Sequence, residues 1–284
     1  MSDVIVESAG PTGIVRLNRP HRGNSVTPQV VTRLGEAVRE LGETDSVHAI
    51  VLTGTGSVFC AGADVQEMHA IFRENGADGF VKYHVDVWWP AVQNAVRALW
   101  NVPKPLVAAF NGAATAGGLD FGLACDARVA ATTARFAESY VNLGMVPVAG
   151  GAFLLPLVVG LPAATELLAS GELIDADRAL CLGLVNEICV PELLGARAAA
   201  MAGRLAHGPA ETFARLKQIT RRAATDELER TLRNSYQANI DLMARDDVRR
   251  RVIATMERYA SGTCRTGWHG PSCAGIKVVS GESP

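Results

Sequence analysis

Hydrophobic positions along the chain follow two spacings, and the change between them marks the predicted elements. Short apolar runs between Gly, Pro and Asn predict buried strands. These runs cover residues 4–7, 13–18, 49–53, 105–110, 126–131 and 183–188. Apolar residues at helical spacing predict helices from Thr27, Val65, Gly76, Ala116 or Gly117, and Ala152, and then over 192–206, 210–223 and 226–259. Strands that alternate with helices before a helical end are typical of an α/β core with a helical C-terminal region.

Residues 111–126 are the first candidate for chemistry. They follow a predicted buried strand and enter a helix at a glycine pair, Gly117 and Gly118. At such a helix start, backbone N–H groups lack intrahelical acceptors and the helix dipole favours negative charge. The corner can therefore hold an oxyanion, with Asp120 about one turn further on. The alternative interpretation is that the glycines permit close packing and that Asp120 only complements the helix dipole.

Composition and charge limit the kinds of partner. The chain has 284 residues, of which 48% are hydrophobic and 20% charged, enough to bury a core in one large domain or in one domain with an appendage. A net charge of -2 gives no electrostatic reason to expect nucleic acid or an anionic membrane as partner. No apolar run is long enough to span a bilayer, and the first residues lack the features of an export signal. We therefore expect a cytoplasmic protein that binds neither nucleic acid nor membrane.

The cysteines do not predict a metal centre. Six occur, at positions 60, 125, 181, 189, 264 and 273. In a chain without an export signal, reduced and mostly buried thiols are expected. Cys264, His269 and Cys273 are close in sequence, but the set lacks a fourth ligand and any CxxC pair. We therefore expect no metal site.

Several small-residue motifs occur in an order that points to one family. Phe-Cys-Ala-Gly-Ala-Asp occupies 59–64, and Asn-Gly is followed by Gly-Gly-Leu-Asp within 111–120. Pro147 and Ala-Gly-Gly at 149–151 come next, with Leu-Asn-Arg-Pro at 17–20 before them and Ala-Leu-Cys-Leu-Gly-Leu-Val-Asn at 179–186 after them. Together they resemble the crotonase superfamily, the enoyl-CoA hydratase/isomerase group, over residues 4–259. Several motifs in the right order are far more specific than one.

This resemblance implies a fold and an assembly. The expected fold is α/β, a crotonase-like spiral of ββα repeats at residues 1–200, followed by a helical C-terminal region at 201–262 that serves trimerisation. Residues 263–284 are rich in Gly, Ser, Cys and Pro without a period, so a flexible tail is expected there. Members of the family usually form homotrimers or homohexamers, and we expect one of these states.

The resemblance also implies a substrate and an oxyanion hole. The substrate would be an acyl-CoA thioester, and no separate cofactor is expected because coenzyme A is part of the substrate. By position, the N–H groups of Ala63 and Gly117 would bind the thioester oxygen and stabilise the enolate, each by ~3 kcal/mol in the transition state. The residues expected beside the substrate and its coenzyme A are Arg22, Ala61, Gly62, Asp64 and Gly118.

The sequence departs from the hydratase pattern at its two acids. Hydratases of this family use two glutamates, whose positions fall on Asp120 and Tyr140. Asp120 keeps a carboxylate on a shorter side chain. Tyr140 keeps only a weakly acidic hydroxyl, which as a second catalytic candidate could still orient a water or donate a hydrogen bond. Hydration needs one group to activate water and another to supply a proton, but a single carboxylate can move a double bond. We expect Asp120 to be the acid/base of an isomerase or, slightly less favoured, a hydratase. Decarboxylation, thioester hydrolysis and non-catalytic acyl-CoA binding remain alternatives.

Three nearby acids receive other roles. Glu138 precedes Tyr140 by two positions and is expected to lie on a different face and to make a structural hydrogen bond. For Asp64, named above among the residues beside the substrate, a cap on the helix at Val65 is the favoured role over contact with the substrate. Glu67, one turn further on, is the reserve candidate for a second acid.

Basic residues are the candidates for coenzyme A phosphates. Arg19 and Arg22 lie in the loop that is beside the nucleotide in relatives, although surface solvation is an equal alternative. By analogy with the family, Arg258 on the C-terminal helix of a neighbouring subunit could also reach the coenzyme.

Overall fold

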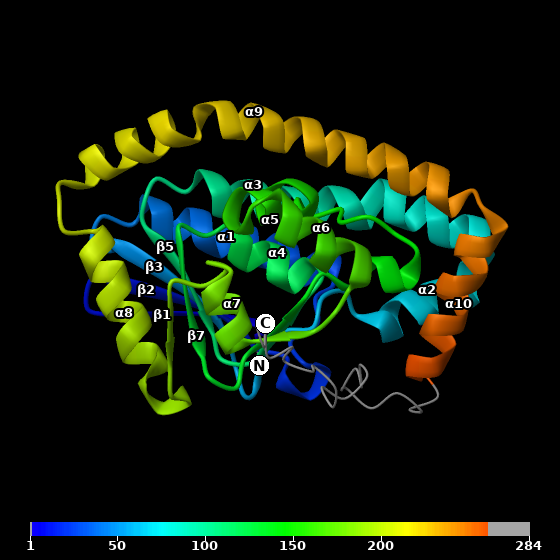
Figure 1. The fold of residues 1–284 in the computed structure, drawn as a ribbon, viewed down its shortest axis with the longest axis horizontal. Coiled ribbons are helices and arrows are strands. Elements are labelled where there is room, and N and C mark those ends of the chain that lie inside the picture. The colour runs from blue at the N-terminus through cyan, green and yellow to red at the C-terminus, as the bar shows by residue number, and fades with distance from the viewer. Residues whose placement is uncertain (1, 261–284) are drawn as a thin grey trace, which may run out of the picture.

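The computed structural model describes residues 2–260, which form two β-sheets enclosed by helices (Figure 1). The strands are β1 (Val4–Ala9), β2 (Thr12–Leu17), β3 (Ala49–Gly54), β4 (Val58–Cys60), β5 (Leu106–Phe110), β6 (Ala113–Thr115), β7 (Ala127–Ala131), β8 (Arg135–Ala137), β9 (Ile174–Asp175) and β10 (Glu187–Cys189). The α-helices are α1 (Pro28–Glu43), α2 (Val65–Tyr83), α3 (Trp89–Asn101), α4 (Gly117–Leu123), α5 (Gly151–Val159), α6 (Leu161–Ser170), α7 (Ala176–Cys181), α8 (Leu194–Leu205), α9 (Ala210–Met243) and α10 (Asp246–Ala260). Four short helices of other types are η1 (Pro20–Arg22), η2 (His84–Trp88), η3 (Ser139–Leu143) and η4 (Pro191–Leu193).

The strand order shows a spiral. The larger sheet runs β1-β2-β3-β5-β7-β10, and the smaller one runs β4-β6-β8-β9. In three successive pairs, β3 and β4, β5 and β6, and β7 and β8, the first strand enters the larger sheet and the second enters the smaller one. Strands of successive pairs are parallel in both sheets. Each turn therefore adds one strand to each sheet, and the predicted α/β spiral of ββα repeats is confirmed.

Aromatic packing between the sheets fixes the position of α4. Phe110 of β5 makes edge-to-face contacts with Phe59 of β4 and Phe136 of β8, at centroid distances of 4.6 and 4.9 Å. A Cβ at Gly122 of α4 would lie 2.2 Å from Phe110 Cζ, so only glycine allows the helix to approach this closely. The three rings are completely or almost completely buried. The helix that carries Asp120 therefore rests directly on the rigid core between the sheets.

The C-terminal helices cover the outside of the spiral. In Figure 1, α9 runs along the upper side of the molecule, α8 lies beside the larger sheet and α10 packs next to α2. A separate small core lies between α8 and strands β3, β5 and β7. Arg97 of α3 binds Glu229 of α9 through two hydrogen bonds of 2.7 and 3.0 Å. Helices α9 and α10 are thus attached to the spiral along their length.

The prediction of a helix break near residue 225 is wrong. Helix α9 continues from Ala210 to Met243, and the chain turns instead at 244–245 before α10. The hydroxyl of Thr225 donates to the Arg221 carbonyl at 2.9 Å and accepts from Trp100 Nε1 at 2.9 Å. Its hydrogen bonds are satisfied within the helix and by α3, so the residue does not cap a new helix.

Two other boundaries were expected, one at the end of the core and one at the start of the C-terminal tail. Residue 200, the expected end of the core, lies inside α8, which packs on the larger sheet. The expected tail at 263–284, with Cys264, His269 and Cys273, lies outside the described residues. None of the helices in residues 2–260 combines the length and the apolar character required to cross a membrane.

Candidate active site

A sharp turn joins β6 to α4 and leaves the first amide of the helix without an acceptor within the helix. Ala116 has φ 48° and ψ −125°, an unfavourable conformation for a residue with a Cβ. Gly117 then begins α4, so its N–H has no intrahelical acceptor. A Cβ at Gly118 would lie 2.3 Å from the carbonyl oxygen of Cys60. The two glycines therefore have separate roles. Gly117 begins the helix with a free amide, and Gly118 allows close backbone packing.

The turn at 61–64 lies opposite this helix start. Val26 N donates to the carbonyl of Gly62 at 2.8 Å, and Asp64 N donates to the carbonyl of Val26 at 2.9 Å. In such a parallel bridge the N–H of the middle residue, Ala63, points away from Val26. A Cβ at Gly62 would lie 3.1 Å from the carbonyl of Thr115 and 3.9 Å from Gly117 N, so the two turns are in contact. This arrangement agrees with the hypothesis that Ala63 and Gly117 donate to one oxygen.

Asp120 and Tyr140 are brought together, as the two catalytic candidates require. The Tyr140 hydroxyl donates to Asp120 Oδ2 at 2.8 Å, although the residues come from α4 and η3. A Cβ at Gly117 would lie 3.4 Å from the Tyr140 hydroxyl, which therefore stands beside the free amide. Asp120 is 0% exposed and lies behind this hydroxyl. The tyrosine is thus positioned between the helix start and the carboxylate.

Glu138 belongs to the same cluster, and the expectation that it lies on a different face is wrong. Its side chain is 1% exposed, and a Cβ at Gly151 would lie 2.2 Å from Asp120 Oδ1 and 2.9 Å from Glu138 Oε1. The two carboxyl groups therefore converge on Gly151, the first residue of α5. The expectation was mistaken because side chains two positions apart in an extended segment share a face. The chain then enters the 3₁₀ helix η3 directly after Glu138, and the absence of a Cβ at 151 leaves room for both acids.

Burial dominates the ionisation of the cluster. Burial raises the pKa of Asp120 to about 7, against the opposing effects of the Tyr140 hydrogen bond and of the neighbouring Glu138 carboxyl. Burial, followed by the nearby charge of Asp120, raises the pKa of Glu138 well above its usual value. Burial and the two carboxyl groups also raise the pKa of the Tyr140 hydroxyl. Burial therefore favours the protonated form of both carboxyl groups, compared with exposed carboxylates.

The acids around residue 64 have different surroundings. Asp64 Oδ1 accepts from the amides of Gln66 and Glu67 at 3.1 and 3.2 Å, as expected of a helix cap. Its Oδ2 is 2.8 Å from Arg19 Nη2, so both oxygens are occupied by protein groups. Glu67 is half-buried; burial and then the charge of Asp64 raise its pKa, and the Tyr83 hydroxyl lies 3.4 Å from its Oε1. Glu67 is not among the groups whose charge shifts the pKa of Asp120.

The remaining substrate candidates frame the turn. Ala61 is exposed; its amide donates to the carbonyl of Gly23 at 3.0 Å and its carbonyl accepts from the Thr115 hydroxyl at 3.1 Å. Arg22 is half-buried and its guanidinium donates to Gln66 Oε1. Arg258 of α10 donates to the Thr255 hydroxyl at 3.0 Å. The structure therefore brings Arg22 and Ala61 to one loop cluster and leaves Arg258 on the helix that packs on α2.

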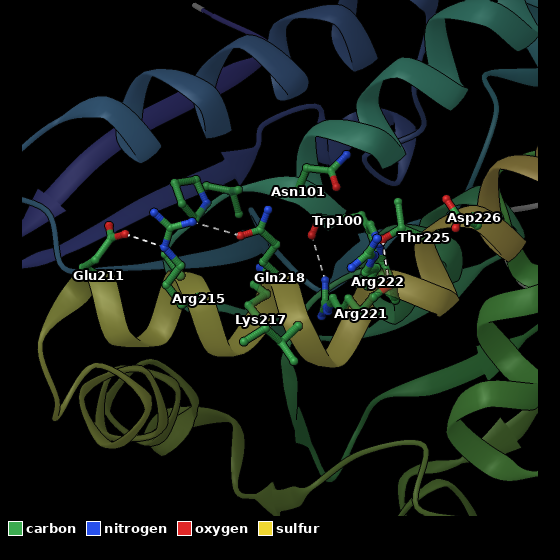
Figure 2. Close-up of a pocket in the computed structure, with 14 residues that line it drawn as sticks. Trp100, Asn101, Glu211, Arg215, Lys217, Gln218, Arg221, Arg222, Thr225 and Asp226 are labelled. Carbon is green, nitrogen blue, oxygen red and sulfur yellow. Dashed lines mark hydrogen bonds and ion pairs between the residues drawn. The ribbon is translucent and has the colours of Figure 1, made fainter.

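A cavity of about 900 Å³ lies elsewhere, between the end of α3 and the first half of α9 (Figure 2). Arg221 lies in its wall with the guanidinium 3.9 Å from the centre of the Trp100 ring. Lys217 and Arg221 are each 2.8 Å from a carboxyl oxygen of Asp126. None of the four residues proposed for the oxyanion hole or the acid/base pair lines this cavity. It is therefore a feature distinct from the candidate site.

Comparison with known proteins identifies the family. The sequence profile described as enoyl-CoA hydratase/isomerase matches residues 10–261. This chain belongs to the enoyl-CoA hydratase/isomerase family, a family of enzymes. It is 30% identical over 260 residues to the short-chain-enoyl-CoA hydratase of Clostridium acetobutylicum, covering 91% of this chain and 96% of that protein. The crystal structure of enoyl-CoA hydratase from Bacillus halodurans superposes with a TM-score of 0.80 at 27% identity, covering 89% of this chain and all of the other.

The enoyl-CoA hydratase/isomerase relatives do not share a single reaction. One is the 4-chlorobenzoyl coenzyme A dehalogenase-2 of an Arthrobacter species, 31% identical over 226 residues that cover 80% of each chain. The names of these relatives share a coenzyme A thioester, whereas the chemistry at the acyl group differs. Family membership therefore supports an acyl-CoA substrate and leaves the reaction to the residues of the site.

Proposed function

We propose that this protein moves the double bond of an enoyl-CoA through a thioester enolate, with Asp120 as the base. The amides of Ala63 and Gly117 would bind the thioester oxygen and stabilise the negative charge of the enolate. The observation that carries the proposal is the buried Tyr140–Asp120 hydrogen bond beside the free amide of Gly117. It supports a proton acceptor near the expected position of the acyl carbons.

The proton would pass through Tyr140, because Asp120 is buried behind the tyrosine hydroxyl. In a 3-enoyl-CoA, the Tyr140 oxygen accepts the proton from C2 as its own proton moves to Asp120. The electron pair of the broken C–H bond forms a dienolate on the thioester. The same path in reverse returns the proton to C4 and leaves the double bond between C2 and C3. No proton is gained or lost overall, and tyrosinate need not form as a stable species.

The positions of the acids favour isomerisation over hydration. Hydration needs an ionised base for water and a second acid for C2, each in contact with the substrate side. Here the second carboxyl, Glu138, lies with Asp120 against Gly151, and the Tyr140 hydroxyl lies beside Gly117. One proton-transfer path is thus available, which is sufficient for moving a double bond.

Other features of the proposed protein follow from its family. The substrate supplies the coenzyme A, so no further cofactor is proposed. A homotrimer or homohexamer would cover apolar side chains that are exposed in the single chain, including Leu157 and Leu161 at 54% and 69% exposure. We also propose a cytoplasmic location.

The test is a panel of 2-enoyl-CoA and 3-enoyl-CoA thioesters, followed by the absorbance of the conjugated thioester. Conversion of a 3-enoyl-CoA is expected, with a loss of roughly 10²–10⁴-fold in kcat for Asp120→Ala. Asp177→Ala, which removes an exposed acid of α7, is the control and should keep the wild-type rate. Equal rates for wild type and Asp120→Ala would remove Asp120 from the mechanism. A silent panel with tight binding of coenzyme A would favour the non-catalytic alternative.

A further inference from the structure

Three oxygens of the buried acid cluster have no hydrogen-bond donor among residues 2–260. They are Asp120 Oδ1 and both carboxyl oxygens of Glu138. A buried carboxylate without a donor is costly, and two facing carboxylates would add repulsion to that cost. One proton placed between the two carboxyl groups removes both problems, because the acid then donates to the carboxylate. The geometry therefore requires a shared proton.

We propose that Glu138 holds this proton and donates it in a hydrogen bond to Asp120, which keeps the negative charge on the proposed base. Glu138 is then a positioning residue, since it acts through Asp120 and does not touch substrate. Its catalytic consequence rests on the proposed function, whereas the position of the proton does not.

The hydrogen bond from Tyr140 decides which carboxyl carries the proton. Tyr140 donates to Asp120 Oδ2 at 2.8 Å, and this bond stabilises a negative charge on Asp120. Within the described part of the chain, neither oxygen of Glu138 has such a donor. With the proton on Glu138, Asp120 accepts from two donors and Glu138 carries no charge. With the proton on Asp120, the charge would lie on the carboxyl group that lacks any other donor.

The neighbours of the pair strengthen this assignment. Asp120 comes from α4, Tyr140 from η3 and Gly151 from α5, and β4 contributes the buried Cys60 beside the tyrosine. Burial raises the pKa of the Cys60 thiol to about 12, so Cys60 is neutral. Across residues 2–260, neither Asp120 nor Glu138 forms an ion pair with a cation. A proton is therefore the available neutralising charge.

The consequence is that the site is active only over a limited range of pH, in which the pair holds one proton. The pair loses its first proton to give the active form, with Asp120 ionised and Glu138 neutral. Loss of the second proton at higher pH would place two negative charges together and would remove the donor to Asp120. Activity is expected to rise as pH increases through the first ionisation, near the value of about 7 given for Asp120.

Infrared difference spectroscopy tests the position of the proton without any turnover. At neutral to weakly alkaline pH, the wild-type protein should show the C=O stretch of a buried protonated carboxylic acid, with a shift in D₂O. The band should be absent from Glu138→Gln and present in Asp120→Asn. Glu172→Gln, which changes an exposed glutamate, is the matched control and should keep both the band and the basal activity. A wild type without the band, or a band lost in Asp120→Asn and kept in Glu138→Gln, would overturn the proposal.

The pH profile tests the effect of Glu138 on the proposed base. Glu138→Gln keeps a neutral donor, so kcat/KM should stay within a few-fold of wild type on the acid side. Glu138→Ala loses the donor, and the acid limb should move to higher pH by about one unit or more. Unchanged limbs in both variants would show a merely structural role. If no enoyl-CoA is converted by any variant while the infrared bands behave as expected, the shared proton stands and the proposed function fails.

Discussion

Two buried aspartates at opposite ends of α4 have contrasting environments. Asp126, just after the helix, is 11% exposed and lies 2.8 Å from Lys217 Nζ and 2.8 Å from Arg221 Nη2. Its Oδ2 also accepts from the amide of Leu106 at 2.8 Å. Asp120, in the first turn, is 0% exposed and has the Tyr140 hydroxyl and the Glu138 carboxyl as neighbours instead of cations.

The difference separates a structural acid from one that can transfer a proton. Two cations bind Asp126 and link the entrance of β5 to α9, so this side chain serves packing. Asp120 has no cation in the described chain, and burial moves its pKa into the range where a proton can be both taken and returned. Within residues 2–260, the proposed base thus lacks the cationic partners that bind Asp126.

The largest expected effect is on catalysis. Asp120→Asn should keep the fold but lower kcat for the enoyl-CoA substrate by roughly 10²–10⁴-fold, because the amide cannot accept the proton. Asp126→Asn, measured at a temperature where it remains folded, should retain kcat within a few-fold. Steady-state kinetics on both variants gives the comparison, and similar losses in the two would contradict the division of roles.

The next largest effect is on stability, and it is expected for Asp126 rather than for Asp120. Asp126→Asn leaves Lys217, a buried lysine, without its counter-charge, and should lower the free energy of unfolding by about 3–5 kcal/mol. Chemical denaturation measures this change. A loss below about 1 kcal/mol would place this ion pair among weak surface pairs and would remove the contrast with Asp120.

A methyl group added at Gly151 should disturb the region around Asp120 and leave the region around Asp126 unchanged. In Gly151→Ala the new Cβ would meet Asp120 Oδ1 at 2.2 Å and Glu138 Oε1 at 2.9 Å, so the carboxyl groups must move. We expect a loss of about 1–3 kcal/mol in stability and a clear fall in kcat. Gly195→Ala in α8 is the matched control, since nothing lies within 4 Å of its Cβ and helix propensity favours alanine. Wild-type kcat in Gly151→Ala would show that the carboxyl positions are not critical.

The smallest effect is a gain in stability. A carboxyl pKa raised from 3.8 to about 7 stabilises the folded protein at low pH, and this contribution is lost as pH rises between those values. Above about pH 7, Asp120→Asn should therefore be more stable than wild type by roughly 1–3 kcal/mol, with no such gain near pH 4. Denaturation at the two pH values checks the sign, and a variant that is less stable at both would contradict it.

The local patterns predicted the turn but not all of its neighbours. The strand before Asn111 and the helix start at Gly117 followed from the apolar run and the glycine pair, and Asp64 caps α2 as its position suggested. The spiral came from the family resemblance, because periodicity alone does not fix strand order. Glu138 was assigned to the wrong face, although the alternation of an extended segment puts it on the face of Tyr140; its convergence with Asp120 on Gly151 of α5 is a tertiary contact that the local pattern does not show.

Exchange of the C2 protons of a saturated acyl-CoA in D₂O tests the central claim most directly, because it reports enolate formation without requiring a complete reaction. Nuclear magnetic resonance should show deuterium entering C2 with the wild-type protein and little or none with Asp120→Asn at equal saturation. Exchange at the same rate in both proteins, or no exchange in the wild type despite binding, would contradict the assignment of Asp120 as the base.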